Sequence, residues 1–505
     1  MGLVTETLAT AAVAGVTTLL ALLLRQYFHF RRLELAIPGP PSLPLLGNTL
    51  DFVSVTPDTV LQTIKRMIGG RRELSRFSFM NHLMVFVSSP EDFECVVRRS
   101  EFNSKSHFVY HLLDDRRSLL QLNGTEWRAR RRALEPGFSK SVLNRFVGTF
   151  YAEAKGFVER VPTDAPVDVL QALRLATSRN FLRTSISADM EEQAMPFVEF
   201  FEAFLRTVNQ RSFNPLLWSE RLFRMTASGK KVSRMKEALH ALVRKALAVK
   251  QDEVKRRGKD GEHTARRRRA LADILVDMHH RAEIPEDDIV DEVKTFFGAS
   301  VETTVSTLSW TLAVLSLHPK LQERLFFEVD AVLGNRDVTA EDLPQLKYLD
   351  CVVKEVLRLF PPIVFVGRQC YRETRLCGHV IPANSTVVLN IQGVHLDPQH
   401  WRDPLAFDPD RFLPENSQGR HHCAYVPFSI GSRNCIGAKY AMMVATTFLA
   451  TIVRAFRVLP AHGHKDVQSL LDNMSFDLAS RLVGGVKVVF QPRPRGGGGG
   501  AVAAA

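Results

Sequence analysis

Near its C-terminus the chain carries one cysteine in a short loop bounded by glycines, and an apolar helical pattern follows. The loop runs from Phe428 to Gly437, and Arg433 stands two residues before Cys435. Glycines let the backbone approach the sulfur closely, loop N–H groups stabilise its charge, and a helix beginning near Ala438 lowers the pKa of the thiol. A thiolate held in this way can serve as the axial ligand of a haem iron. The alternative is an ordinary buried cysteine beside a turn.

The net charge indicates which kinds of partner the protein can have, and the cysteine pattern indicates whether its thiols are reduced. The chain of 505 residues carries a formal net charge of +12, which favours an anionic membrane surface or an acidic protein partner. Its arginines are not interleaved with aromatic residues along one face, as binding of single-stranded nucleic acid requires, so we expect no nucleic acid partner. The cysteines show no Cys-x-x-Cys pairing. All but Cys435 are therefore interpreted as reduced structural thiols.

An apolar segment at the N-terminus predicts a membrane anchor in residues 1–32. The run from Leu8 to Leu24 is interrupted only by small residues and threonines, and its length lies near the lower limit for a membrane span. Arg25, Arg31 and Arg32 follow the run and no basic residue precedes it. The positive-inside rule therefore places the N-terminus in the lumen and the remaining chain in the cytosol. A cleaved signal peptide is the alternative, but the basic segment that it requires is missing.

Behind the anchor, the sequence divides into a hinge, one large domain and a tail. Residues 33–48 are assigned to a proline-rich hinge. Its stretch from Ile37 to Asn48 is predicted to be stiff and non-helical, because proline fixes φ and removes a backbone donor. Residues 49–492 form one domain in which helical spacing of apolar residues dominates, with short β-type runs between 71 and 93. The charged stretch from Lys255 to Arg269 is interpreted as a solvated, mobile loop, and residues 493–505 as a disordered Gly/Ala tail.

A long helical pattern with a gap in its middle is the second motif that indicates chemistry. It runs from Pro285 to His318 and stops before Pro319. Its centre contains small residues followed by Glu302 and Thr303, and the threonine can donate to a carbonyl one turn back and bend the helix. An acid next to an alcohol in such a gap suits proton delivery to dioxygen as it is reduced. The alternative is a kink in a buried helix.

Together these motifs resemble the cytochrome P-450 superfamily. Its haem-binding signature has an aromatic residue, glycine, arginine, cysteine and glycine at fixed spacing, as this chain has at Phe428, Gly431, Arg433, Cys435 and Gly437. The resemblance implies a mainly α fold with a small β component. It also implies haem b as cofactor, with the Cys435 thiolate as metal ligand and the aromatic, arginine and final glycine among the cofactor-binding residues.

The long helix resembles the oxygen-activating helix of the same superfamily. Glu302 and Thr303 match its acid–alcohol pair and are the catalytic residues that the resemblance implies. Ser300 departs from the usual glycine and is expected to tighten the groove slightly. The two motifs also occur in the order that the superfamily has.

Further arginines match positions with structural or cofactor roles. Glu355 and Arg358 share one face of a helix that ends at two prolines. The resemblance implies that Arg411 joins them in a bidentate Glu–Arg–Arg network that supports folding. It also implies that Trp127, Arg131, Arg368 and Arg433 bind the haem propionates. A packing tryptophan in a basic surface helix is the alternative for the first two, and Arg128, Arg130 and Arg132 are expected to form a basic face for an acidic reductase.

The closest resemblance is to the animal branch that includes fatty-acid ω-hydroxylases, of microsomal type. It rests on the segments 102–105, 127–132 and 433–437. Many members of that branch have a glutamate that esterifies the haem at the position of Ala299, so covalent attachment is not expected here. The aromatic run between Met195 and Phe213 is interpreted as core, with the lining of an access channel or contact with the membrane as the alternatives.

The resemblance implies a membrane-bound monooxygenase of the endoplasmic reticulum that takes a lipophilic substrate and O2. Fatty-acid hydroxylation is favoured, with sterol or xenobiotic oxidation as the alternative by the same chemistry. The chain shows no Gly-x-Gly-x-x-Gly fingerprint, so electrons must come from an NADPH–cytochrome reductase flavoprotein, with cytochrome b5 as a further candidate donor. Two other classes remain open at this point: a haem-thiolate isomerase or dehydratase that does not use O2, and a non-catalytic haem-binding protein.

Overall fold

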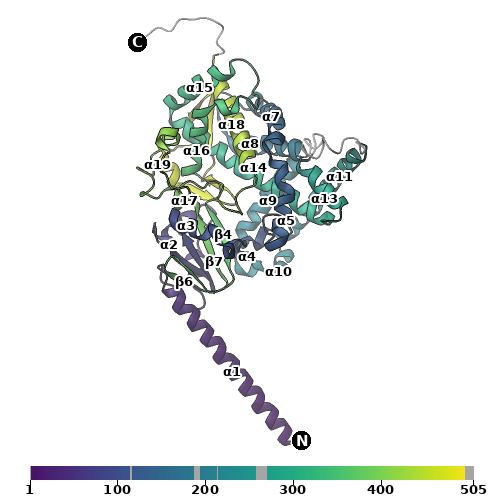
Figure 1. Cartoon of the computed structure of the whole chain (residues 1–505), viewed down its shortest axis with the longest axis vertical. Helices are drawn as coiled ribbons and strands as arrows, with labels where there is room; N and C mark the ends of the chain where they lie inside the picture. The colour runs from purple at the N-terminus through teal and green to yellow at the C-terminus, as the bar shows by residue number, and fades with distance from the viewer. Residues whose placement is uncertain (1, 114–116, 187–193, 213, 257–269, 495–505) are drawn as a thin grey trace.

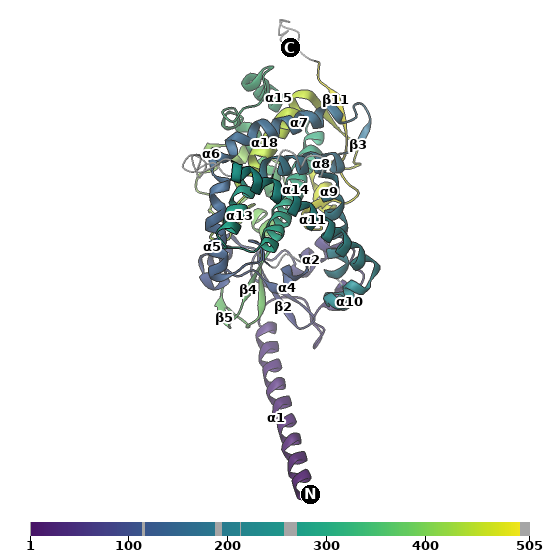
Figure 2. The ribbon, with the colours of Figure 1, turned by 90° about the vertical axis from the view of Figure 1, so that its right-hand side faces the viewer.

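The computed structural model describes residues 2–113, 117–186, 194–212, 214–256 and 270–494. It shows a mainly helical domain with several small sheets, as predicted, and one long helix that extends away from it (Figures 1 and 2). Most of the predicted loop between Lys255 and Arg269, and the tail after Pro494, lie outside the described residues.

The protruding helix is α1 (Gly2–Leu35). Its segment Thr10–Leu35 is, within the described part of the chain, the one helix that is long and apolar enough to cross a membrane. The end of α1 is fixed to the domain through Glu34, whose side chain accepts a hydrogen bond of 2.6 Å from Ser78 Oγ and whose backbone carbonyl accepts one of 2.7 Å from Arg76 Nε. Arg76 also donates to the carbonyl of Pro40, so the same arginine holds both the proline-rich segment and the end of α1 against the domain.

The helices follow one another through the domain, with α14 passing through its centre (Figure 2). The longer ones are α2 (Val60–Ile68), α3 (Pro90–Arg98), α5 (Gly124–Leu134), α7 (Val147–Arg160), α8 (Val169–Phe181), α9 (Ala194–Ser212), α11 (Ala227–Arg256), α13 (Leu271–His280), α14 (Glu286–Leu317), α15 (Pro319–Leu333), α16 (Lys347–Leu359) and α18 (Ala438–Ala455). Shorter helices are α4 (His107–Tyr110), α6 (Lys140–Leu143), α10 (Glu220–Met225), α17 (Ile391–His395) and α19 (Val467–Asp472).

Within the described residues, the strands form four small sheets. The largest has the order β1-β2-β7-β4, in which β2 and β7 are parallel and the other neighbours antiparallel. The others are β3-β11-β8, β9-β10 and β5-β6. The bounds are β1 (Ser75–Phe79), β2 (His82–Val87), β3 (Pro166–Asp168), β4 (Phe365–Cys370), β5 (Thr374–Leu376), β6 (His379–Ile381), β7 (Ser385–Asn390), β8 (Phe456–Pro460), β9 (Met474–Phe476), β10 (Ser480–Leu482) and β11 (Lys487–Pro492).

Helix α14 forms the middle of the main hydrophobic core, which contains most of its apolar side chains together with those of α8, α16 and α18. It begins after Pro285 with three acidic residues, which suit the positive end of the helix dipole, and it ends at His318 before Pro319. These are the limits that the sequence predicts. Because α14 packs against several other elements, the few of its residues that are not buried, such as Ala299 and Thr303, are held rigidly.

Candidate active site

The cysteine loop has the backbone conformation that the sequence predicts. The N–H of Cys435 donates to the carbonyl of Phe428 at 2.9 Å and closes the loop. Gly431 has a φ of +82°, and a Cβ at this position would lie 3.2 Å from the carbonyl oxygen of Val97. Both facts favour glycine there. Gly437 is the N-cap of α18, so the sulfur lies beside a helix N-terminus.

The pKa of the Cys435 thiol is raised, which corrects the predicted net direction. Desolvation of the sulfur by the surrounding protein is the largest cause, although the residue as a whole is exposed. A hydrogen bond with the backbone of Gly437 and the charges of Arg131 and Lys105 act in the opposite direction, so the predicted contribution of the helix N-terminus is present but smaller than the effect of burial. Coordination to a metal would deprotonate the thiol outright.

Three cations, Lys105, Arg368 and Arg433, lie close to one another, and Lys105 also acts on this thiol. Lys105 and Arg368 are paired across an isolated antiparallel bridge, and the side chain of Arg433 follows from the cysteine loop. Burial is the main cause that lowers the pKa of each, to about 9 for Arg433, and their mutual repulsion lowers the pKa of Lys105 and Arg433 further. Arg433 donates through Nη2 to the carbonyl of Leu122 at 2.8 Å and stacks on the ring of Trp127 at 4.4 Å.

These cations fit the carboxylates of a haem. Among the described residues, Arg368 Nη1 and Arg433 Nε and Nη1 are buried and have no hydrogen-bond partner. Buried donors without a partner cost free energy, and two propionates would supply both the acceptors and the negative charge. The residues present therefore fit the cofactor that the sequence predicts. Lys105 was missed as a site residue, because only the pairing of its strand-like segment with Arg368 brings it to the site.

The predicted cofactor residues on α5 have different environments. Trp127 is buried under Arg433, as a propionate neighbour would be. Arg131 donates to the carbonyl and side-chain oxygen of Asn434, at 2.9 and 3.0 Å, and so braces the cysteine loop directly. The prediction for Arg130 as part of a basic face is wrong. It is buried and pairs with Asp288 and Glu292 of α14 at 3.1 and 2.6 Å, whereas Arg128 and Arg132 are exposed.

The acid and the alcohol on α14 occupy adjacent faces of the helix. Thr303 Oγ1 donates to the carbonyl of Ala299 at 2.7 Å, which is the hydrogen bond that the sequence predicts. Ala299 is exposed and Thr303 half-buried, so together they form an open strip. Ser300, which replaces the usual glycine, is hydrogen-bonded to the hydroxyl of Tyr440 on α18. This bond shows how the larger residue is accommodated.

The carboxylate of Glu302 lies against Arg174 of α8, at 3.1 Å from Nη2. Burial raises the pKa of Glu302, while the charge and hydrogen bond of Arg174 lower it. The carboxylate also borders a cavity of about 210 Å³ between α14, α8 and the β9-β10 hairpin, whose lining includes the charged side chains of Asp477 and Arg481. A buried carboxyl with a raised pKa, beside a cavity with charged side chains in its lining, suits the transfer of protons from solvent.

The aromatic residues of α9 belong to the hydrophobic core, which is the interpretation that the sequence favours over an access channel or membrane contact. Phe197, Phe200 and Phe201 are buried in the main hydrophobic cluster, and Phe213 lies outside the described residues. The ring of Phe201 packs directly on Gly298 of α14, where an added Cβ would come within 2.5 Å of its Cε1 atom. A larger residue at Gly298 would therefore displace this ring.

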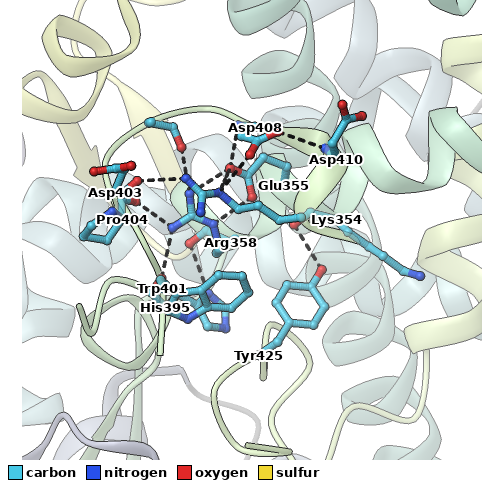
Figure 3. Close-up of polar contacts among 12 residues, drawn as sticks. Lys354, Glu355, Arg358, His395, Trp401, Asp403, Pro404, Asp408, Asp410 and Tyr425 are labelled. Carbon is cyan, nitrogen blue, oxygen red and sulfur yellow. Dashed lines mark hydrogen bonds and ion pairs between the residues drawn. The ribbon is translucent and has the colours of Figure 1, made fainter. Parts of the chain in front are cut away.

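The Glu–Arg network lies where α16 meets the segment that leads to the cysteine loop (Figure 3). Glu355 and Arg358 are both fully buried and form a bidentate pair with two bonds of 2.7 Å. Arg411 joins this pair, as the resemblance implies, but with a single contact rather than a bidentate one. Its Nε lies 3.5 Å from Glu355, and its other nitrogens donate to the carbonyls of Arg402 and Asp403.

Comparison with known proteins identifies this arrangement. The sequence model of the family described as Cytochrome P450 matches residues 37–481. The chain belongs to the cytochrome P450 family. It is similar to "Probable cytochrome P450 4ac1" of Drosophila melanogaster, with 31% identity over 86% of this chain and 87% of the relative. It is 30% identical to "Cytochrome P450 4V2" of Rattus norvegicus over 89% of each chain.

A solved structure supports the P450 fold. The structure titled "Retinoic acid bound cyanobacterial CYP120A1" superposes with a TM-score of 0.74, at 22% identity, over 90% of this chain and 100% of the other. Family membership makes the protein a haem-thiolate monooxygenase, an oxidoreductase that uses O2, a lipophilic substrate and electrons from a redox partner. The relatives also confirm the likeness to the animal fatty-acid ω-hydroxylase-type branch.

In this P450, replacing Thr303 by alanine should uncouple NADPH consumption from product formation. The hydroxyl is the polar group on the open strip of α14, and its loss removes a hydrogen-bonding site for the water that delivers protons. We expect NADPH oxidation within about threefold of the wild type, with most electrons appearing as hydrogen peroxide. Product formation should fall much further, because proton-transfer groups typically contribute about 10²–10⁴-fold to the rate of the chemical step. Peroxide and product are measured together. Coupling that equals the wild type would remove Thr303 from proton delivery.

Proposed function

We propose that this P450 hydroxylates fatty acids at the endoplasmic reticulum membrane. The observation that carries the choice of substrate is the likeness to the ω-hydroxylase-type branch, in the segments 102–105, 127–132 and 433–437 and in two relatives whose names carry the family number 4. Sterol or xenobiotic oxidation by the same chemistry is the second candidate.

The cofactor in this proposal is haem b, held without a covalent bond. Cys435 is its thiolate ligand, Lys105, Arg368 and Arg433 pair with its propionates, and Trp127 packs beside them. When bound, a haem-thiolate supplies reductive activation of O2 and transfer of one oxygen atom into a C–H bond. Because Ala299 offers no carboxylate, acidified organic solvent should extract all of the haem from the protein.

The side chains around the cofactor contribute proton transfer and positioning. Glu302 takes up protons from the cavity that it borders between α14 and α8 and passes them towards the strip formed by Ala299 and Thr303. Arg174 holds the carboxylate in place while it is charged. The small side chain of Ala299 leaves room on this strip for the reacting end of a hydrocarbon chain.

The membrane placement rests on α1 and on the segment that follows it. Leu43, Leu45, Leu46 and Leu50 are exposed, and they lie just after the helix that is able to span a membrane. Exposed apolar side chains at this end of the domain suit contact with lipid. With α1 spanning the membrane once and the basic residues of its C-terminal half on the cytosolic side, the domain faces the cytosol. There it can receive electrons from NADPH–cytochrome reductase, with cytochrome b5 as a further donor.

The test is a binding and turnover screen of the full-length protein, reconstituted with the reductase in lipid. Fatty acids, sterols and drug-like compounds are titrated while the Soret band is followed, and the products are identified by mass spectrometry. We expect fatty acids to shift the band and to give hydroxylated products that depend on NADPH. If sterols or drug-like compounds give both signals and fatty acids give neither, the proposed substrate class is wrong.

A further inference from the structure

A cluster of metal-binding side chains lies apart from the haem site, between α3 and the segment that leads into the cysteine loop. The carboxylate of Glu94 on α3 stands between two histidines of that segment. Its Oε2 atom lies 3.2 Å from Nε2 of His421, and its Oε1 atom lies 3.3 Å from Nε2 of His422. The two imidazole rings are stacked, with centroids 4.8 Å apart.

Cys423 adds a sulfur to the same cluster. One ring nitrogen of His421, one of His422 and the sulfur of Cys423 all lie within 4.8 Å of one another. Ligand atoms around a tetrahedral zinc ion, with bonds of about 2.0–2.3 Å, are separated by about 3.3–3.8 Å. The two contacts of Glu94 with the imidazoles, 3.2 and 3.3 Å, are already close to this spacing. The separations among His421, His422 and Cys423, which reach up to 4.8 Å, need to shorten by at most roughly 1 Å.

We propose that Glu94, His421, His422 and Cys423 bind one zinc-class divalent cation. Two imidazole nitrogens, a thiolate and a carboxylate suit Zn²⁺, whereas Mg²⁺ and Ca²⁺ prefer sites made of oxygen atoms alone. The thiolate and the carboxylate together balance the two charges of the ion. Binding releases the thiol proton of Cys423 to solvent, as metal sites with cysteine ligands do.

A neighbouring cluster shows why the ion is assigned to this set. Glu91, Asp397 and His400 also have ligand atoms within 4.8 Å of one another. Arg72 already occupies that cluster, with contacts of 2.6 Å to Glu91 and 2.8 Å to Asp397. The guanidinium of Arg72 therefore occupies the place that a metal ion would take in this cluster.

At the proposed site the competing cation is easily displaced. Arg98 pairs with Glu94 from the next turn of α3, but its side chain is 73% exposed and can move into water. His421 Nδ1 lies 3.2 Å from the backbone N of Cys423. Because an ion on Nε2 places the ring proton on Nδ1, this contact must open when the ion binds.

The ion would tie α3 to the support of the haem-binding loop. The residue after Cys423 is Ala424, whose carbonyl accepts a hydrogen bond from the indole of Trp401 at 3.2 Å. Two residues later, the N–H of Val426 donates to His395 Nε2 at 2.8 Å. Zinc therefore acts as a structural cross-link that raises the melting temperature of the holoprotein without entering the reaction.

The experiment measures zinc bound per chain and its affinity in the full-length holoprotein. Wild type, His422→Ala, Cys423→Ser and the control His280→Ala are stripped with a chelator, dialysed against zinc and titrated in competition with a chromogenic chelator. His422 and His280 are both exposed histidines, so neither substitution threatens the fold. We expect about one zinc per chain, with affinity about 10–100-fold weaker in His422→Ala and unchanged in the control.

X-ray absorption at the zinc edge, which is separate from the iron edge, should show one sulfur at about 2.3 Å in the wild type and none in Cys423→Ser. The ferrous–CO spectrum reports that each variant retains its haem site. Zinc bound equally tightly by the wild type and His422→Ala, zinc with no sulfur ligand in the wild type, or no retained zinc in the wild type would each overturn the proposal.

Discussion

Replacing Cys435 by serine should abolish the red-shifted Soret band of the ferrous–CO form and reduce NADPH-dependent product to background. The thiolate is the one strong electron donor that the loop offers to iron, and a serine hydroxyl is neither as acidic nor as polarizable. Serine retains the backbone bond from residue 435 to Phe428 and fits the same volume, so the loop should keep its shape. Absorption spectra after reduction under carbon monoxide provide the measurement.

The matched control for this prediction is Cys95→Ser. Cys95 is an exposed cysteine on α3, and its replacement should leave both the spectrum and the activity unchanged. Haem content of the Cys435 variant, measured as a pyridine complex, separates loss of the ligand from loss of the cofactor. A ferrous–CO band that stays red-shifted as in the wild type, together with full haem content, would exclude Cys435 as the iron ligand.

The elements with strong local signals were predicted well from the sequence. The limits of α14 and α16 follow from continuous helical spacing that prolines end, and β1 and β2 follow from short β-type runs. The cysteine loop is recognisable from the sequence because all of its residues lie between Phe428 and Gly437 and belong to a single closed turn. In each case the information lies within a few residues, where local propensity and tertiary structure agree.

Side chains whose partners are distant in sequence were predicted less well. Arg130 was grouped with Arg128 and Arg132, but residues two apart lie on nearly opposite sides of a helix. That spacing alone indicated that one of the three faces a different environment, and its acidic partners are on α14. Lys105 was missed for a similar reason, because the bridge to Arg368 that places it is formed only in the folded protein.

The pKa of Cys435 shows a different limit. The sequence indicates which groups lie next to the thiol in the chain, namely the helix N-terminus and its glycine. It does not indicate how much protein surrounds the sulfur from other elements. Desolvation depends on that packing, and here it outweighs the neighbouring donors and charges.

The second large effect is expected for Arg358→Lys, which should prevent most of the protein from retaining haem. All five N–H groups of Arg358 are used: two on Glu355 and three on the carbonyls of His395, Pro404 and Ala406. Lysine keeps the charge but has three donors on one nitrogen and cannot match this arrangement. Disrupting a buried pair of this kind costs about 3–5 kcal/mol, which is a large part of the stability of a typical domain.

Loss of the Arg358 contacts should also disturb the cysteine loop, because the residues that Arg358 holds in place support the segment that leads into this loop. His395, whose carbonyl accepts from Arg358, also accepts the N–H of Val426 through its ring, and Tyr425 donates to the carbonyl of Lys354 on α16 (Figure 3). We therefore expect a lower ratio of ferrous–CO signal to total protein, and unfolding at a lower urea concentration.

Arg457→Lys is the matched control for this substitution. Arg457 also pairs with a glutamate, Glu323, at 3.0 Å, but its side chain is 52% exposed, so the change should cost no more than about 0.5 kcal/mol. If Arg358→Lys retained haem and resisted urea as well as this control, the five hydrogen bonds would not be what holds the loop support in place. Loss of haem in Arg358→Lys alone would show that geometry, rather than positive charge, is what this buried position requires.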